Sequence, residues 1–304
     1  MNPADSPAAP APAPAAPAWL DRGLYPFSPR RFRTAEGELS YLDEGAGPPV
    51  LFVHGTPSWS FEWRACVRAL APTRRCVAPD HLGFGLSEKP SGPGAARVLR
   101  PEDHAARLLA LVRRLDLRDL TLVVHDFGGP VGLPVALDEP GRVARLVVVN
   151  TWAWPNGDDA VARRLDRLVR SPLGRFLYRW LNISPRVLLP AAFADKRRLT
   201  PAVRRHYVAP FARRADREGP YALARALVGS DPFYASLWAR RGEFARLPAT
   251  VVWGGRDPAF GPRHLARWVD ALPAASVDRV EAAGHFVAEE APEAIVRAVA
   301  STGA

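Results

Sequence analysis

The sequence contains little cysteine and lysine and has no long hydrophobic run. Cys66 and Cys76 are the only cysteines among 304 residues. The sequence leaves open whether they form a disulfide. Two cysteines in a chain of this length favour free thiols in a reducing cytoplasm. No run of about 18 consecutive apolar residues is present, which argues against a membrane span. We therefore expect a cytoplasmic protein without a membrane partner, and the sequence leaves its oligomeric state open.

The basic charge of the chain comes almost entirely from arginine. The formal net charge is +10, and lysine occurs only at Lys89 and Lys196. Arginine is densest over residues 163–217, where several arginines stand in adjacent pairs. No basic stripe interleaved with aromatic residues, and no nucleic-acid-binding motif, accompanies them. The pattern favours arginines on solvated helix faces, and we expect no nucleic-acid partner.

The first eighteen residues consist mostly of alanine and proline, with Asp5 as the only charged side chain. They lack the basic start and the continuous apolar core of a secretion signal. This composition predicts a disordered, partly extended tail over residues 1–22. The remainder is long enough for one large α/β domain with an insertion, or for two small domains.

The chain from residue 23 onward alternates between short apolar runs and amphipathic segments. An antiparallel hairpin is expected over residues 31–44, around Glu36-Gly37. The other expected strands cover residues 49–53, 75–79, 120–125, 146–150, 249–253 and 277–281, and the expected helices cover 58–71, 101–116, 131–140, 262–271 and 291–300. This alternation predicts a doubly wound, mostly parallel eight-stranded sheet with helices on both faces.

The alternation stops over residues 152–238, which contain several prolines and tryptophans and no convincing strand. This region predicts a helical cap inserted after one strand of the sheet. We therefore assign residues 23–151 and 239–304 to an α/β core and residues 152–238 to the cap. In such a core, catalytic groups gather at the carboxyl ends of the strands.

The stretch Leu122–Gly132 ends an apolar run at Asp126 and continues directly with Gly128 and Gly129. A buried strand, a sharp turn with one functional side chain and a helix form the nucleophile elbow of α/β-hydrolases, in which esterases carry serine. A carboxylate at that place is ionised at neutral pH and can displace a leaving group from saturated carbon to form an ester. Taken singly, Asp126 is also typical of a helix N-cap.

Two further residues follow later strands in the order of an α/β-hydrolase triad, Asp257 after the strand at 249–253 and His285 after the strand at 277–281. His285 is expected to activate water, and Asp257 to hold its tautomer. The backbone amides of Thr56, in the loop after strand 49–53, and of Phe127 are expected to form an oxyanion hole. Alone, Asp257 beside Pro258 also fits a turn.

Several segments together resemble the haloalkane dehalogenases over about residues 24–300: His54–Arg64, Pro79–Ser87, His125–Pro130, Asn150–Pro155, Trp253–Phe260 and Gly284–Val287. The resemblance implies hydrolysis of a carbon–halogen bond in a small apolar substrate, with an alcohol, a halide and a proton as products. It implies no cofactor and no metal.

The chain departs from this family at the groups that receive the halide. The family usually has tryptophan directly after the nucleophile and often asparagine in the early loop, where this chain has Phe127 and Thr56. Phenylalanine has no N–H, and threonine offers only a hydroxyl. Trp152, Trp154 and Trp59 are the candidates to supply an indole from another direction, although packing is the commoner role of a tryptophan.

Two alternatives therefore remain. Epoxide hydrolases share the elbow and the triad but use two cap tyrosines as acids, and the expected cap offers four tyrosines, Tyr178, Tyr207, Tyr221 and Tyr234. The second alternative is a ligand-binding relative of these enzymes that does not turn over a substrate. The intact triad argues against this second alternative.

Overall fold

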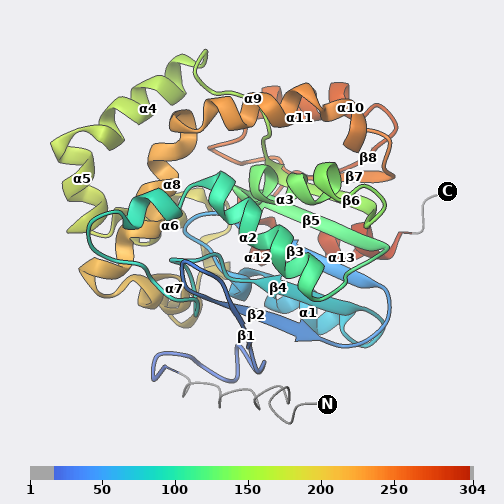
Figure 1. The fold of residues 1–304 in the computed structure, drawn as a ribbon, viewed down its shortest axis with the longest axis horizontal. Coiled ribbons are helices and arrows are strands. Elements are labelled where there is room, and N and C mark those ends of the chain that lie inside the picture. Colours follow the sequence, from blue (N-terminus) through green and yellow to red (C-terminus); the bar gives the residue numbers. More distant parts are fainter. Residues whose placement is uncertain (1–16, 302–304) are drawn as a thin grey trace, which may run out of the picture.

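The computed structural model describes residues 17–301 and contains one eight-stranded sheet (Figure 1). Its strand order is β1-β2-β4-β3-β5-β6-β7-β8. The bounds are β1 Arg30–Arg33, β2 Glu38–Glu44, β3 Pro49–Val53, β4 Arg75–Pro79, β5 Leu120–Asp126, β6 Val143–Thr151, β7 Ala249–Gly254 and β8 Ser276–Val280. The β1/β2 and β2/β4 pairs are antiparallel, and all other neighbours are parallel. The fold predicted from the sequence is confirmed.

Helices cover both faces of this sheet because successive side chains of the central strands point to opposite faces. In β5, Leu122 and Val124 belong to the core cluster on the side of α2 (Pro101–Arg114), α3 (Gly128–Asp138) and α11 (Pro262–Ala271). Val123 belongs to the cluster on the side of α1 (Arg64–Leu70) and α13 (Pro292–Ala300). The core elements outside the sheet are η1 Ser60–Trp63, α1 Arg64–Leu70, η2 Ala95–Val98, α2 Pro101–Arg114, α3 Gly128–Asp138, α11 Pro262–Ala271, α12 Val287–Glu290 and α13 Pro292–Ala300.

Between β6 and β7 the chain forms helices only, and Figure 1 shows α4, α5 and α8 projecting to one side of the sheet. These elements are α4 Ala160–Arg170, α5 Pro172–Arg179, η3 Ser184–Leu188, α6 Leu189–Ala192, η4 Lys196–Arg198, α7 Pro201–Val208, η5 Ala209–Phe211, η6 Arg214–Arg217, α8 Glu218–Gly229, α9 Asp231–Ala239 and α10 Arg241–Phe244. The division into core and cap at residues 152 and 238 stays a prediction.

The predicted N-terminal tail falls mostly on residues 1–16, which lie outside the described residues. Residues 17–22 are described, and here Leu20 is buried and Trp19 packs edge-on against Trp59, with the ring centroids 5.8 Å apart. The packed chain therefore begins before residue 23. Cys66 and Cys76 are both buried and unpaired. In the described part of the chain, no helix is both long and apolar enough to cross a membrane.

Candidate active site

Asp126 stands at a sharp turn between β5 and α3. Its φ of 52° lies in the left-handed region, which costs energy for a residue other than glycine and is tolerated where the surroundings fix it. The Thr151 hydroxyl donates a hydrogen bond to the Asp126 carbonyl oxygen. A Cβ atom at Gly128 would overlap the Val53 carbonyl oxygen, so only glycine lets α3 start this close to β3. This turn holds the Asp126 carboxylate at the carboxyl edge of the sheet.

The structure brings Asp126, Asp257 and His285 together from three separate strand ends. His285 Nδ1 is 2.8 Å from Asp257 Oδ2, and His285 Nε2 is 3.6 Å from Asp126 Oδ2. All three residues are buried, with at most 8% of their surface exposed. The imidazole therefore lies between two carboxylates, one on each ring nitrogen.

Asp257 is held by four hydrogen-bond donors. Oδ1 accepts from the amides of Ala259 and Phe260, and Oδ2 accepts from Asn150 Nδ2 at 2.6 Å as well as from His285. Burial raises the pKa of this carboxyl, but the His285 charge and these hydrogen bonds outweigh burial and hold it well below its usual range. Asp257 is therefore ionised, and it fixes the His285 tautomer with the proton on Nδ1.

His285 is a stronger base than an ordinary histidine. Burial lowers its pKa, but the carboxylates of Asp257, Asp126 and Glu62 oppose burial and raise the pKa to about 9. The imidazole is therefore protonated in the resting site at neutral pH. Any event that neutralises one of these carboxylates lowers the His285 pKa, so that the imidazole gives up its proton and becomes available as a base.

The two oxygens of Asp126 have different surroundings. Oδ1 accepts a hydrogen bond from the Thr56 amide at 2.8 Å, and the Phe127 amide also donates to this carboxylate. Oδ2 faces His285 Nε2. Burial raises the pKa of Asp126 even though His285, His125 and the two amides lower it. Oδ1 is therefore the oxygen that the Thr56 amide holds, and Oδ2 is the oxygen that faces the imidazole.

Two buried residues that support His285 were missed from the sequence. Glu62, in η1, is fully buried, and its Oε1 lies 3.2 Å from Nδ1 of His125. The Nε2 atom of His125 is 3.0 Å from the His285 carbonyl oxygen. Glu62 therefore connects through His125 to the backbone of His285. An acidic residue inside a short apolar helix was the only signal in the sequence.

The three candidate tryptophans have different environments. The indole N–H of Trp59 donates to the His206 carbonyl oxygen at 2.9 Å, so this donor is already used to join the core to α7. Trp154 packs among Trp238, His264 and Trp268. Trp152 is fully buried and packs edge-on against the Phe127 ring, with the centroids 4.7 Å apart.

Two buried donors without a partner in the described protein belong to residues that contact Asp126 or its neighbour Phe127. They are the indole N–H of Trp152 and the hydroxyl of Thr56. An unpaired buried donor is costly, and ligand sites are a common reason to retain one. These two groups are therefore candidate hydrogen-bond donors for a leaving group.

One of the four cap tyrosines differs from the others. Tyr207 donates to Glu289, Tyr221 to the Val169 carbonyl oxygen and Tyr234 to the Ala226 carbonyl oxygen. Among the described residues, the Tyr178 hydroxyl makes no hydrogen bond. Burial and the charge of Asp126 raise the pKa of Tyr178 to about 12. No cluster of three or more metal-binding side chains occurs in residues 17–301.

Comparison with known proteins places this geometry among related enzymes. A family model described as alpha/beta hydrolase fold matches residues 48–292. The chain is 36% identical over 282 residues to haloalkane dehalogenase 2 of Mycobacterium tuberculosis, covering 92% of this chain and 96% of that protein. It is 34% identical to cis-3-alkyl-4-alkyloxetan-2-one decarboxylase of Shewanella oneidensis, covering 90% of this chain and 87% of that protein. The crystal structure of haloalkane dehalogenase DbeA from Bradyrhizobium elkani superposes with a TM-score of 0.79 at 27% identity, covering 90% and 96% of the two chains.

Proposed function

Because this chain belongs to the haloalkane dehalogenase family of α/β-hydrolases, we propose that it hydrolyses a carbon–halogen bond through an ester on Asp126. The observation that carries the proposal is the placement of Asp126 at the elbow, with His285 Nε2 3.6 Å from Oδ2 and the Thr56 amide on Oδ1. The substrate is a small halogenated molecule. We place the reaction in the cytoplasm, in keeping with two buried free thiols.

In the first step Oδ2 of Asp126 attacks the carbon that carries the halogen. A carbon–oxygen bond forms, and the halide leaves with the bonding electrons. Oδ1, held by the Thr56 amide, becomes the carbonyl oxygen of the ester. The Thr56 hydroxyl and the Trp152 indole N–H receive the halide, in place of the tryptophan and asparagine expected at positions 127 and 56.

In the second step water gives a proton to His285 Nε2 and attacks the ester carbonyl carbon. The negative charge that develops on Oδ1 is stabilised by the amides of Thr56 and Phe127. Collapse of this intermediate releases the alcohol and restores the Asp126 carboxylate, and the proton then leaves His285. Asp257 stabilises the imidazolium throughout.

The covalent step is tested by trapping the ester. The variant His285→Gln, incubated with 1-bromobutane, is expected to gain the mass of one butyl group on the peptide that contains Asp126, with bromide released once per protein molecule. Wild type is expected to release bromide continuously. The variant Asp126→Asn is the control and is expected to release none. Continuous bromide release by Asp126→Asn would refute the proposed nucleophile.

The halide donors are tested by a matched pair of variants. Loss of a hydrogen bond to an anion costs about 1.5 to 3 kcal/mol, so Trp152→Phe is expected to slow bromide release about 10- to 100-fold. Trp154→Phe removes an indole N–H from a neighbouring tryptophan cluster and is expected to leave the rate within about threefold. Equal effects of the two substitutions would remove Trp152 from the proposal.

A second candidate function is the opening of a strained oxygen ring, an epoxide or a four-membered lactone. Phe127 lacks the N–H that a halide needs, and Tyr178 offers a free hydroxyl within the field of Asp126. One relative is itself named for a four-membered lactone, the oxetan-2-one. In this reaction Asp126 forms an ester bond to a ring carbon, the bond from that carbon to the ring oxygen breaks, and the Tyr178 hydroxyl gives its proton to the departing oxygen.

The two candidates separate when bromoalkane, epoxide and 3,4-dialkyloxetan-2-one are supplied side by side. Bromide release that is insensitive to Tyr178→Phe supports the dehalogenase. Turnover of an oxygen ring that falls in Tyr178→Phe, but not in the matched variant Tyr221→Phe, supports the second candidate. If wild type turns over none of these substrates and His285→Gln forms no adduct with them, the protein is a ligand-binding relative without catalysis.

A further inference from the structure

The cap carries most of the exposed hydrophobic side chains of the described chain. Nine of eleven such side chains lie within residues 161–188 and are 45% to 59% exposed. We call this set the apolar cap surface, and its members are Val161, Leu165, Leu168, Leu173, Phe176, Trp180, Leu181, Val187 and Leu188. Single exposed apolar residues are ordinary, but a concentrated set marks an interaction surface.

Helical periodicity gathers these side chains on one side of each helix. Val161, Leu165 and Leu168 repeat at the spacing of one face of α4, and Leu173, Phe176 and Trp180 do the same on α5. The core is reached through other positions, such as Ala162 and Val169 of α4. Both helices therefore have an apolar face that the described part of the chain does not cover.

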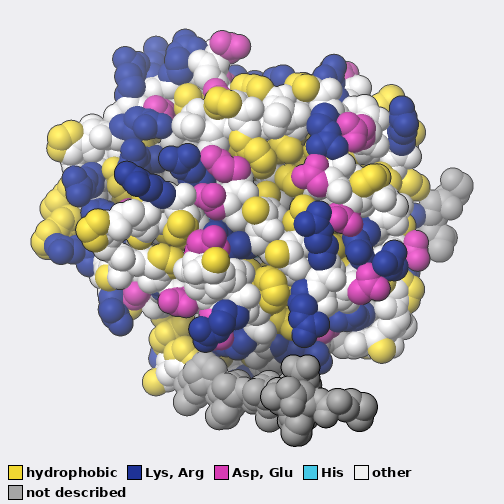
Figure 2. Space-filling view, in the orientation of Figure 1, with side chains coloured by type: hydrophobic (Ala, Val, Ile, Leu, Met, Phe, Trp, Pro, Cys, Tyr) yellow, Lys and Arg dark blue, Asp and Glu magenta, His cyan; other side chains and the backbone are white. Residues whose placement is uncertain are grey.

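Arginine occupies many of the remaining positions of this segment. Residues 160–188 contain seven arginines and one acidic residue, Asp166. Among the described residues five of these arginines have no carboxylate partner: Arg163, Arg164, Arg167, Arg175 and Arg186. Figure 2 shows hydrophobic side chains along the left margin of the molecule, with dark blue basic side chains beside them.

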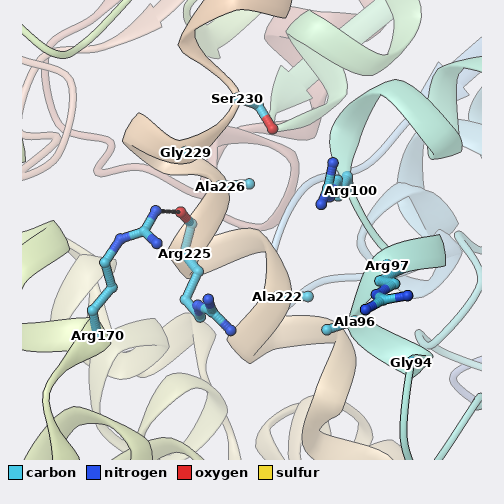
Figure 3. Close-up of a pocket in the computed structure, with 10 residues that line it drawn as sticks. All are labelled: Gly94, Ala96, Arg97, Arg100, Arg170, Ala222, Arg225, Ala226, Gly229 and Ser230. Atoms are coloured by element: carbon cyan, nitrogen blue, oxygen red, sulfur yellow. Dashed lines mark hydrogen bonds between the residues drawn. The ribbon is translucent and has the colours of Figure 1, made fainter.

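Further basic charge lies next to α4. Arg97 and Arg100 line one side of a cavity of 430 Å³, and Arg170 and Arg225 line the other (Figure 3). No acidic residue lines this cavity. Arg170 Nη2 donates to the Arg225 carbonyl oxygen at 3.0 Å, which ties α4 to α8. Arg100 pairs with Glu102 and Arg170 with Asp166, whereas Arg97 and Arg225 have no carboxylate partner among the described residues, so the surface beside the apolar face carries an excess of positive charge.

We propose that the apolar cap surface docks on an anionic lipid bilayer, with α4 and α5 lying in the plane of the interface. Helices that combine exposed tryptophan, phenylalanine and leucine with an arginine-rich polar face are typical of such binding. The cytoplasmic leaflet is negatively charged and attracts arginines near its surface. The mode is peripheral, and it revises the expectation that the protein has no membrane partner.

Charge distinguishes this partner from a second copy of the chain. A two-fold contact through the apolar cap surface would bring two segments together, each with seven arginines and one acidic residue. Like charges at such a contact repel, whereas lipid phosphates complement them.

Sedimentation of the full chain with vesicles tests the proposal without any substrate. Wild type is expected to bind vesicles of phosphatidylcholine and phosphatidylglycerol, and to bind phosphatidylcholine vesicles much more weakly. Removal of two exposed aromatic side chains in Phe176→Ser/Trp180→Ser is expected to weaken binding at least about tenfold, because the bilayer would bury both of them. Val269→Ser/Val277→Ser changes the two other exposed hydrophobic side chains and is expected to bind as wild type.

A second variant, Arg163→Glu/Arg164→Glu/Arg167→Glu, is expected to lose the preference for phosphatidylglycerol, and circular dichroism checks that each variant is folded. Vesicle binding that is unchanged in Phe176→Ser/Trp180→Ser overturns the proposal. Absence of vesicle binding by wild type also overturns it. If the wild type binds no vesicles but forms oligomers that dissociate in Phe176→Ser/Trp180→Ser, the surface is a contact with a second copy of the chain. Because no catalysis is measured, this result is independent of the proposed reaction.

Discussion

The charge of Asp126 is expected to set the basicity of His285, and Asp126→Asn tests this directly. Asparagine keeps the shape of the side chain, tolerates a positive φ and removes the charge. His285 Nε2 lies 3.6 Å from Asp126 Oδ2. For two unit charges at about this distance, an effective dielectric constant of about 20 gives about 4 to 5 kcal/mol, or about 3 pKa units.

The pKa of His285 is therefore expected to fall from about 9 in wild type to about 6 in Asp126→Asn. Formation of the ester in the proposed mechanism removes the same charge. Before the ester forms, His285 is protonated at neutral pH, and its positive charge supports the Asp126 anion. After the ester forms, the imidazole is neutral at the same pH and can accept a proton from water.

The assay is an NMR titration of the histidine ring signals in wild type and in Asp126→Asn, with His285→Gln to assign the signal. Asp278→Asn removes a carboxylate from β8 outside the site and is the matched control. It is expected to leave the His285 pKa unchanged. A His285 pKa that stays near 9 in Asp126→Asn would refute the reasoning, because Asp257 and Glu62 would then account for the whole rise.

Three further results are expected. Gly55→Ala would place a Cβ atom inside the Asp126 carboxylate, so it should abolish bromide release while thermal unfolding still shows a cooperative transition; normal turnover would contradict this. Glu62→Gln keeps the shape beside His125 but removes a charge that raises the His285 pKa. The His285 pKa measured by NMR should therefore fall by less than in Asp126→Asn. A larger fall would contradict the expectation that Asp126 raises this pKa more than Glu62 does. The folded His285 pKa lies above the unfolded value of about 6.5, so its stabilising contribution is complete below about pH 6.5 and is lost as pH rises to about 9. In urea unfolding, the excess in free energy of unfolding of wild type over His285→Gln should therefore shrink by about 3 kcal/mol over that window. An excess that does not change with pH would contradict this prediction.

The sequence by itself determined the sheet and the place of the triad. Each strand is a short apolar run, and in a doubly wound sheet the residues after such runs meet at one edge. Asp126, Asp257 and His285 could therefore be placed together from their order and position alone. Asp126 could be predicted as the nucleophile because the glycines that follow it let the helix pass close to the strand.

The tertiary structure decided which donors are free and which are used. The sequence offered Trp59, Trp152 and Trp154 as equivalent indoles, and four tyrosines as equivalent phenols. Packing engages Trp59 with the His206 carbonyl oxygen, and within residues 17–301 it leaves the Trp152 N–H and the Tyr178 hydroxyl without a partner. Such pairings join residues far apart in sequence, and no local pattern encodes them.

The same reason explains why the sequence did not reveal the contacts of Glu62 and Asn150 or the exposure of the apolar cap surface. Glu62 and Asn150 acquire a role only when folding brings them to His125 and Asp257. The apolar positions of α4 and α5 have a helical period that predicts a buried face, and the sequence alone cannot say that the fold leaves that face uncovered. Local periodicity fixes which residues share a face, whereas burial depends on what the rest of the chain packs against it.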